Sequence, residues 1–464
     1  MERRWFLKHA GLFLAGVSLT SKKVFSAEKI KNNNMNEIKI VGHDSNFERE
    51  ELRFPFGFKG GYLSELWQVV SLIRSEKGNL GIGLSTQSVL YGDSNFFARH
   101  AEAQGNALMY ALSGRALGLI AGKSFTDPIE LFDAIMPSLY QQAKKLTGSE
   151  DLNINFVYNA LVNVDNALWM LYAKENGITR FNELMPPIYR EAFSFKNDRI
   201  AIMFQISYDM PLQDIEQAAQ QGYFIFKIKT GSPGSAEQML DKDIQRLGQI
   251  HEMLSAIKTP HTPSGRVMYT MDANGRYENK ESLRPYLAYA KEIGAFDQIL
   301  LYEEPFIESN TENVTDLGVL MACDESLHNE QDALRKIDLG YKAFVLKGIA
   351  KTLSQTLKIA AVAHKNGIPC LCSDLTVNPI LIDWNKNIAA SMKPFPGLGM
   401  GMMETNGDMN YKNWQQMERK HPFAGASWTQ VNQGMFTLND DFYKHAGGIF
   451  EVGDHYKQMM RIEV

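Results

Sequence analysis

The stretch Ile299-Leu300-Leu301-Tyr302-Glu303-Glu304-Pro305 changes from apolar to acidic over a few residues. The same change, from an apolar run to a charged end, occurs at 223–229, 267–272, 319–325 and 343–347. Strands of a parallel barrel are buried on both faces, so their bodies are apolar and charged residues belong at their carboxyl ends. We therefore interpret these five segments as barrel strands that end at a functional rim.

Further apolar runs extend the pattern to eight segments. Helical sequence separates most of them, and the clearest helix is Leu353–Asn366, which ends before Gly367 and Pro369. Strands that alternate with helices predict an α/β fold with a parallel sheet. Eight such units within residues 191–405 predict a (β/α)8-type barrel as the catalytic domain. The expected strands lie near 200–207, 223–229, 267–272, 298–303, 318–324, 342–347, 368–373 and 398–404.

The sequence on either side of this region has a different character. Residues 51–190 mix strand-like sequence with helical sequence, and helices are expected at 97–117 and 155–175. Residues 28–50 are polar and are expected to form a flexible leader. We expect the tail at 406–464 to return to the domain that precedes the barrel.

Residues 1–27 have the features of an export signal. Arg3-Arg4-Trp5-Phe6-Leu7-Lys8 gives a charged start, an apolar run follows from Ala10 to Leu19, and small residues stand at Ser26 and Ala27. This pattern indicates a cleaved signal, with a single uncleaved anchor as the alternative. The paired arginines resemble a twin-arginine signal, which exports folded proteins, so we expect a periplasmic protein. Removal of five basic residues and one acid with this segment would shift the net charge from −5 to −9.

Composition narrows the class of protein further. The 464 residues are an ordinary globular mixture, and the pI near 6.1 argues against a nucleic-acid partner or a polybasic membrane contact. Cys323, Cys370 and Cys372 are too few and too close together for a disulfide framework. No apolar stretch of about 18 residues follows the N-terminus, so stable membrane insertion is not expected.

Three consecutive expected strands end in acids, namely Asp272, Glu303 and Asp324. Carboxylates that converge on one spot repel each other and have raised pKa values unless a cation lies between them. Oxygen ligands favour a hard divalent ion, so we expect a Mg²⁺ site, with Mn²⁺ as an alternative. Zinc is disfavoured because the sequence contains no HxH, HExxH or CxxC pattern.

Lysines end the strands on either side of these acids. Lys227 and Lys229 are two residues apart on one strand, so their side chains share a face, and Lys347 ends a strand on the opposite side of the barrel. Two adjacent ammonium groups beside a cation are expected to lower each other's pKa, as a lysine base requires near neutral pH. Two opposed lysines could remove a proton α to a carboxylate from one face and return one to the other. The metal and Lys227 would have to stabilise the enolate.

These motifs resemble those of the enolase superfamily, in particular its muconate-lactonizing-enzyme subgroup, which includes the dipeptide epimerases. The similarity rests on Lys227-Ile228-Lys229, Asp272-Ala273-Asn274, Glu303-Glu304-Pro305, Cys323-Asp324-Glu325 and Lys347, in this order. It covers about 190–405 and implies that 51–190 and 406–464 form the α+β capping domain of that family. Loops of this domain over the barrel mouth are expected at the glycine-rich stretches 57–61 and 81–92.

The resemblance also implies roles for the site residues. Asp272, Glu303 and Asp324 would bind the metal, with Glu303 rather than Glu304 as the ligand. Lys229 and Lys347 would be the acid/base pair. Lys227 would tune Lys229 and contact the substrate carboxylate. Asn274 and Glu325 would support the site from outside the ligand set.

The last strands depart from the pattern of the dipeptide epimerases. Those enzymes carry Asp-x-Asp on the last strand, where it holds the substrate ammonium, whereas this chain has Glu404-Thr405-Asn406. Asp374 follows Ser373 at the end of the seventh strand, where mandelate racemases and sugar-acid dehydratases use a histidine. We place Asp374, Glu404 and Asn406 among the groups that support the site or contact the substrate.

The combined expectation is a Mg²⁺-dependent racemase or epimerase that acts on an amino-acid derivative or dipeptide. A lyase or cycloisomerase that uses the same enolate is one alternative. A non-catalytic protein that binds a carboxylate is another. The expected partner is a small carboxylate substrate, and the formation of a homo-oligomer stays open.

Overall fold

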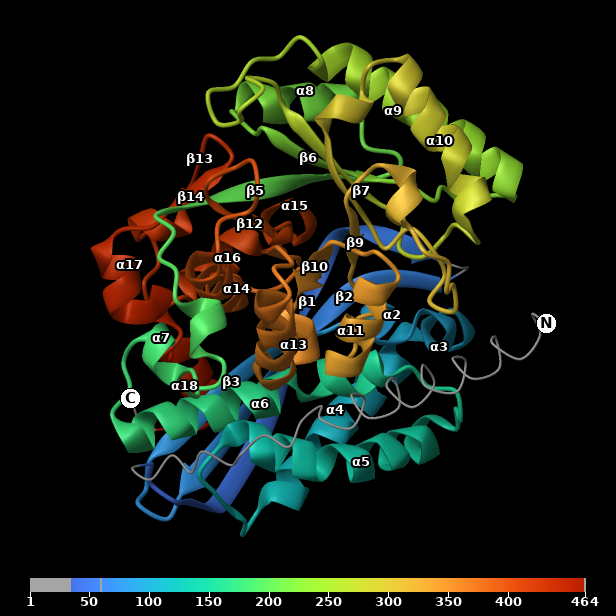
Figure 1. Ribbon diagram of the computed structural model, residues 1–464. Coiled ribbons are helices and arrows are strands. Elements are labelled where there is room, and N and C mark those ends of the chain that lie inside the picture. Colours follow the sequence, from blue (N-terminus) through green and yellow to red (C-terminus); the bar gives the residue numbers. More distant parts are fainter. Residues whose placement is uncertain (1–34, 59–60, 463–464) are drawn as a thin grey trace, which may run out of the picture. The chain divides into compact units, whose positions relative to one another are not determined.

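The computed structural model describes residues 35–58 and 61–462 (Figure 1). The expected signal at 1–27 therefore lies outside the described residues, as do residues 28–34 of the expected leader. Within the described ranges, no helix is long and apolar enough to cross a membrane.

Eight parallel strands form a closed barrel, which confirms the predicted fold class. Each strand pairs with its neighbour in sequence order, and the last strand pairs with the first through Gly401 with Ile200 and Glu404 with Met203. The strand bodies are almost entirely buried, as the apolar runs in the sequence require. The strands are β5 (Arg199–Ile206), β6 (Ile225–Lys229), β7 (Met268–Asp272), β8 (Ile299–Glu303), β9 (Met321–Cys323), β10 (Ala343–Leu346), β11 (Cys370–Cys372) and β12 (Gly401–Glu404).

Helices connect successive barrel strands except β8 and β9, between which only the 3-10 helix Thr315–Leu317 lies. They are α8 (Leu212–Gln220), α9 (Ala236–Leu254), α10 (Lys280–Glu292), α11 (Glu330–Asp338), α12 (Gly348–Lys351), α13 (Leu353–Lys365) and α14 (Pro379–Ser391). Helix α13 confirms the expected helix, and Gly367 just beyond it adopts a φ of 66°, which favours glycine. Short 3-10 helices lie at Arg190–Phe193, Phe296–Gln298, Thr315–Leu317, Ser427–Thr429 and Ala446–Gly448.

An antiparallel sheet precedes the barrel. Its strand order is β3-β2-β1-β4, from β1 (Ile38–Phe58), β2 (Gly61–Ser75), β3 (Leu80–Gln87) and β4 (Ser124–Phe125). The helices of this domain are α2 (Val89–Gly92), α3 (Ser94–Arg99), α4 (Glu102–Ile120), α5 (Pro128–Thr147), α6 (Ile154–Asn176) and α7 (Phe181–Leu184). Figure 1 shows these helices gathered beside the blue strands.

Two expectations for this part of the chain need correction, and a third is confirmed. The leader expected over 28–50 is wrong from Ile38 onward, because β1 begins there; its polar residues belong to a strand that β2 covers along one edge. The helix expected over 97–117 is two helices, α3 and α4, which are separated at His100 and Ala101. The helix expected over 155–175 is confirmed as α6.

The loop expected at 81–92 is also wrong in its first half, which is strand β3. Gly81 and Gly83 bring β3 against α6: a Cβ atom at Gly81 would lie 2.2 Å from the Ala167 carbonyl oxygen, and one at Gly83 would lie 2.0 Å from that of Asn163. The glycines therefore serve close packing of a strand on a helix. The second half of the stretch forms α2.

The C-terminal segment contacts both domains. It contains α15 (Gly407–Asn410), α16 (Trp414–Arg419), β13 (Val431–Asn432), β14 (Met435–Thr437), α17 (Asp440–His445) and α18 (Asp454–Met459). Strand β14 pairs antiparallel with β5 of the barrel. Lys420 forms ion pairs with Glu48 and Glu50 of β1, and His455 lies 2.8 Å from Glu48.

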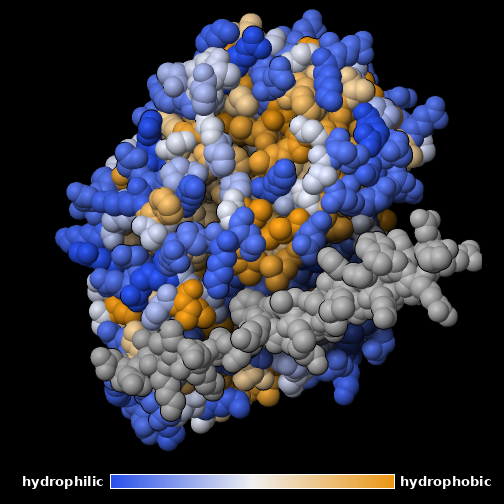
Figure 2. Space-filling model, in the orientation of Figure 1, coloured by the Kyte–Doolittle hydropathy of each residue, from blue (hydrophilic) through white to orange (hydrophobic). Residues whose placement is uncertain are grey.

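The face of the molecule drawn in Figure 2 is largely hydrophilic, with hydrophobic residues gathered chiefly in its upper half.

Candidate active site

The carboxyl ends of the barrel strands bring the predicted charged residues together. Lys227 on β6 is buried, and its Nζ lies 3.0 Å from Asp272 Oδ2, 2.9 Å from Glu303 Oε2 and 3.1 Å from Glu404 Oε2. Asp272 pairs in register with Lys229 on one side and with Glu303 on the other. Strand pairing therefore fixes these side chains next to each other at the barrel rim.

Lys229 occupies the outer position on the same strand. Its Nζ lies 2.5 Å from Asp272 Oδ2 and donates to Asn274 Oδ1 at 2.9 Å. The Asn274 amide donates in turn to Glu325 Oε1 at 3.0 Å. Asn274 and Glu325 thus link Lys229 to the loop after β9.

Lys347 reaches the same rim from β10. Its Nζ lies 2.5 Å from Asp324 Oδ2, and both side chains are buried. Strand β10 is four strands from β6 in the closed ring of eight, so Lys347 and Lys229 enter from opposite sides of the barrel. The strands that carry Asp272, Glu303 and Asp324 lie between them.

The backbone distinguishes Glu303 from Glu304. Glu303 ends β8 and contacts Lys227, whereas Glu304 follows in the left-handed region with a φ of 36°. The Glu304 carboxylate accepts the backbone N–H of Asp324 at 2.7 Å. Glu304 therefore holds the turn after β9, and Glu303 is the member of the pair in the barrel interior.

The ends of β11 and β12 supply a second set of polar groups. Glu404 accepts from the Ser373 hydroxyl at 2.6 Å, in addition to its ion pair with Lys227. Asp374 accepts the backbone N–H of Asn406 at 2.9 Å. The Asn406 amide donates to Gln205 Oε1 on β5 at 2.6 Å, so all three predicted residues lie at the rim, held by one another.

Burial and neighbouring charges shift the pKa values of these acids in different directions. Burial, and then the charge of Asp272, holds the pKa of Glu303 well above its ordinary value. Burial alone would raise the pKa of Asp272, but the ammonium groups of Lys227 and Lys229 outweigh burial and lower it. Burial followed by Asp324 raises the pKa of Glu325 to about 8, and burial followed by Glu404 raises that of Asp374 to about 7.

The expected lowering of the lysine pKa values is not found. Burial and the charge of Lys227 lower the pKa of Lys229, but the charges of Asp272, Glu404 and Glu303 together outweigh them and the net pKa lies above the ordinary value. The pKa of Lys227 is also raised, because Asp272, Glu303 and Glu404 outweigh its burial. The prediction assumed a cation beside the two ammonium groups, whereas the pKa values found here reflect the protein groups alone, among which the acids dominate.

The site carries more acid than base. Its carboxyl groups are Asp272, Glu303, Glu304, Asp324, Glu325, Asp374 and Glu404, and its ammonium groups are Lys227, Lys229, Lys347 and Lys351; we call these residues the rim cluster. Acids therefore exceed lysines by three when all are ionised. Glu303 Oε2 lies in ion-pair contact with Lys227, whereas the buried Asp324 Oδ1 accepts no hydrogen bond from the described residues and lies 3.6 Å from Lys351 Nζ.

The rim cluster has the charge and the donor atoms that a divalent cation requires. A hard cation would neutralise the surplus carboxylate charge, and carboxylate oxygens such as the buried Asp324 Oδ1 are the donors that it prefers, so the residues fit in donor type and charge. Across 35–58 and 61–462, no three His, Cys, Asp or Glu side chains stand arranged as a ready metal site. Lys227 and Lys347 instead form the ion pairs with the three acids.

Several rim residues were not predicted from the sequence. Lys351 on α12 donates to the backbone carbonyls of Asp324 and Leu327 and lies 3.6 Å from Asp324 Oδ1. Tyr91 on α2 places its ring 4.6 Å from Lys347 Nζ. Lys351 lies four residues after Lys347, a helical spacing that could have suggested it. Nothing in the local sequence connects Tyr91 to the barrel.

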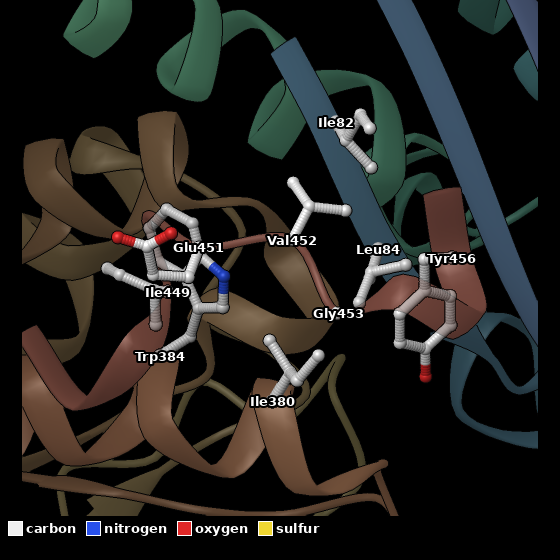
Figure 3. A pocket seen from close by; sticks show the side chains of 9 residues that line it. All are labelled: Ile82, Leu84, Ile380, Trp384, Ile449, Glu451, Val452, Gly453 and Tyr456. Carbon is white, nitrogen blue, oxygen red and sulfur yellow. The ribbon is translucent and has the colours of Figure 1, made fainter. Parts of the chain in front are cut away.

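A small cavity lies elsewhere in the molecule. Figure 3 shows Ile82 and Leu84 of β3 facing Ile380 and Trp384 of α14, with Val452 between them. Its volume of about 20 Å³ is sufficient for a water molecule and too small for a substrate. None of the residues that line it belongs to the rim cluster.

Comparison with known protein families agrees with the barrel fold and with the residues gathered at its rim. Residues 212–422 match the family described as enolase C-terminal domain-like. This part of the chain begins at α8 and contains the rim cluster. No curated protein matches the sequence.

Solved structures show the same fold over most of the chain. A dipeptide epimerase from Enterococcus faecalis V583, complexed with Mg and the dipeptide L-Leu-L-Tyr, is 16% identical with a TM-score of 0.60, over 86% of this chain and 97% of that one. The L-Ala-D/L-Glu epimerase from Bacillus subtilis is 18% identical, with a TM-score of 0.58 over 81% and 91%. An N-succinyl Arg/Lys racemase from Bacillus cereus ATCC 14579 is 15% identical, with a TM-score of 0.59 over 86% and 93%. At these identities the similarity establishes the fold.

Proposed function

We propose that this chain is a member of the enolase superfamily and a divalent-cation-dependent racemase or epimerase. It would abstract a proton α to the carboxylate of an amino-acid derivative or dipeptide. The observation that carries the proposal is the position of Lys229 and Lys347 on opposite sides of one barrel, with Asp272, Glu303 and Asp324 on the strands between them. Inversion at carbon requires groups of this kind on both faces.

The metal would be Mg²⁺, with Mn²⁺ as an alternative, and its ligands would be Asp272, Glu303 and Asp324. When bound, such a cation supplies positive charge that stabilises the negative charge gained by the substrate carboxylate as the α-proton leaves. Lys227, buried beside Glu303 and Glu404, would add a second positive charge near that carboxylate. A metal among the acids would also relieve the surplus negative charge of the rim cluster.

Lys229 and Lys347 would then exchange roles between the two directions of the reaction. One lysine, as the neutral amine, takes the α-proton, and the C–H bonding pair moves into the carboxylate as the enolate forms. The opposite lysine, as the ammonium, gives a proton to the other face of the α-carbon and restores the carboxylate. Each lysine ends in the protonation state in which the other began, and exchange with solvent resets the pair.

The names of the similar structures support the substrate class. Two of them act on dipeptides and one on an N-succinylated amino acid, and all three substrates carry a hydrogen atom α to a carboxylate or amide carbonyl. Glu404 in this chain is already engaged by Lys227 and Ser373. We therefore propose an amino-acid derivative or dipeptide without choosing between them.

The test is proton NMR in D₂O with purified protein and Mg²⁺. The probes are L-Leu-L-Tyr, L-Ala-L-Glu with its D-Glu epimer, and N-succinyl-lysine. The proposal predicts loss of an α-proton signal with conservation of mass, apart from deuterium, and appearance of the other epimer. Loss of water or ring closure would instead indicate a lyase or cycloisomerase, and binding without exchange would contradict catalysis.

We also propose export by the twin-arginine route, from the pattern of residues 1–27.

A further inference from the structure

The capping domain contacts the half of the rim that carries Lys347 through α2 and α6. Helix α2 places the Tyr91 ring over Lys347, and the first turn of α6 places Asn155 so that its amide donates to the Glu325 carbonyl oxygen at 3.0 Å. Asn155 Oδ1 also accepts a hydrogen bond from His328 Nδ1 at 3.0 Å. These contacts reach the loops after β9 and β10, which is the half of the rim that carries Lys347.

Lys347 and Lys229 differ in their surroundings. The Lys347 side chain is 5% exposed and lies between Asp324 and the Tyr91 ring. The Lys229 side chain is 14% exposed and is held by Asp272 and Asn274. Asp324 accepts one N–H of Lys347, and the ring faces the ammonium from another side.

Among the described residues, the Tyr91 hydroxyl forms no hydrogen bond to the rim cluster. This hydroxyl is buried and has no hydrogen-bond partner elsewhere in the described ranges, and the Tyr91 backbone N–H donates to Ser88 at 3.4 Å. The ring contact with Lys347 is therefore the interaction by which Tyr91 acts on the rim cluster. An ammonium group over an aromatic face is stabilised electrostatically, and more so when water is excluded.

We infer that Tyr91 is a positioning residue, which holds the Lys347 amine through its ring at the face of the substrate that Lys347 serves. This inference rests on the proposed function and extends it. Through Tyr91, the capping domain would set the rate of α-proton exchange on one face of the substrate α-carbon. The loss of the ring should slow exchange of the epimer whose α-proton points to Lys347. Exchange of the epimer whose α-proton points to Lys229 should stay at the wild-type rate.

The experiment compares Tyr91→Leu, which removes the ring, with Tyr91→Phe, which keeps the ring and removes the hydroxyl. Tyr140→Leu is the matched control, because the Tyr140 ring lies 4.7 Å from Lys144 Nζ on α5, in the same domain but away from the rim cluster. Initial exchange rates in D₂O are measured separately for L-Ala-L-Glu and L-Ala-D-Glu. Tyr91→Leu should lower the rate for one epimer roughly tenfold, as expected for a desolvated cation–π contact. Tyr91→Phe and Tyr140→Leu should preserve the ratio of the two rates.

A second readout does not depend on activity. Acetic anhydride labelling, followed by peptide mass spectrometry, reports how accessible each lysine is. Tyr91→Leu should increase labelling of Lys347 severalfold and leave Lys229 unchanged, whereas Tyr91→Phe should match the wild type.

Equal slowing of both epimers by Tyr91→Leu would overturn the inference, because it would indicate general damage to the fold. Unchanged rates and unchanged labelling would overturn it as well. If the wild-type protein exchanges neither epimer, the proposed function fails on these probes. The labelling then decides whether Tyr91 positions Lys347: selective exposure supports the contact, and no change overturns it.

Discussion

The Lys227 ammonium nitrogen lies 2.9 Å from Glu303 Oε2, and both side chains are almost completely buried. The same nitrogen also contacts Asp272 and Glu404. This single charge therefore holds three strand ends together inside the barrel. Removing one member of a buried charge group leaves the others uncompensated, which is strongly destabilising.

We predict that Lys227→Met lowers the free energy of unfolding by about 3–5 kcal/mol at neutral pH in the absence of divalent cations. Urea denaturation followed by circular dichroism measures this change. Lys229→Met is the comparison: Lys229 is more exposed and pairs with Asp272 alone among the acids, so its removal should cost less. Equal stability of Lys227→Met and the wild type would contradict the role given to Lys227.

Glu303 and Glu304 should respond differently in cation binding. Glu303 contacts Lys227, whereas Glu304 accepts the backbone N–H of Asp324, so under the proposed function Glu303 rather than Glu304 would be the ligand. We predict that Glu303→Gln weakens Mg²⁺ binding at least tenfold, on the order of the effect of losing one charged ligand or its support. Glu304→Gln, the matched control, should have the smaller effect. Isothermal titration calorimetry measures both, and the reverse order would refute the assignment.

The pH dependence of stability should carry a contribution from Asp165. Asp165 on α6 accepts the backbone N–H of Ser354 at 3.0 Å and the Ser354 hydroxyl, and so joins the capping domain to α13 of the barrel. Burial raises its pKa to about 6, although the bonds from Ser354 offset part of the shift. The folded state therefore binds this proton more tightly than the unfolded state does.

Because the folded state binds the proton more tightly, protonation of Asp165 stabilises the fold at low pH. The contribution of Asp165 to stability is fully present below the unfolded pKa near 4 and is lost as the pH rises through about 6. A shift of this size corresponds to about 3 kcal/mol. We predict that Asp165→Asn removes a decrease of about this size between pH 4 and pH 7, as measured by urea denaturation across that range. An identical pH profile for the variant and the wild type would contradict the prediction.

Much of the site was predictable because each strand end carries its own signal. Asp272, Glu303, Asp324, Lys227 and Lys347 each follow an apolar run, and a closed parallel barrel brings all such ends to one rim. The pairing of Asp272 with Glu303 then follows from strand order. The barrel could be predicted for the same reason, since its strands and helices are defined over short stretches.

The remaining features depend on contacts between distant segments. Tyr91 reaches Lys347 across more than 250 positions of sequence, so no local pattern connects them. The polar residues 38–50 of strand β1 suggested a leader. This part of the strand is held mainly by pairing with β2 and not by an apolar core. The pKa of Lys229 was misjudged because its sign depends on how close Asp272 lies, and spacing in sequence does not give that distance.

Export should depend on the paired arginines. We predict that Arg3→Lys together with Arg4→Lys abolishes appearance of the protein in the periplasm, because twin-arginine signals are recognised through that pair. Fractionation followed by immunoblotting measures the location, and Lys22→Arg with Lys23→Arg is the control for charge in the same segment. Unchanged export of the double-lysine variant would contradict the proposed route.

The most direct measurement is α-proton exchange in D₂O, with L-Ala-L-Glu and L-Ala-D-Glu, for Lys229→Ala and Lys347→Ala beside the wild type. If the two lysines serve opposite faces of one carbon, the wild type exchanges both epimers and neither variant interconverts them. Each variant should retain exchange of only one epimer, and the two variants should retain different ones. Interconversion at the wild-type rate by either variant would contradict the account.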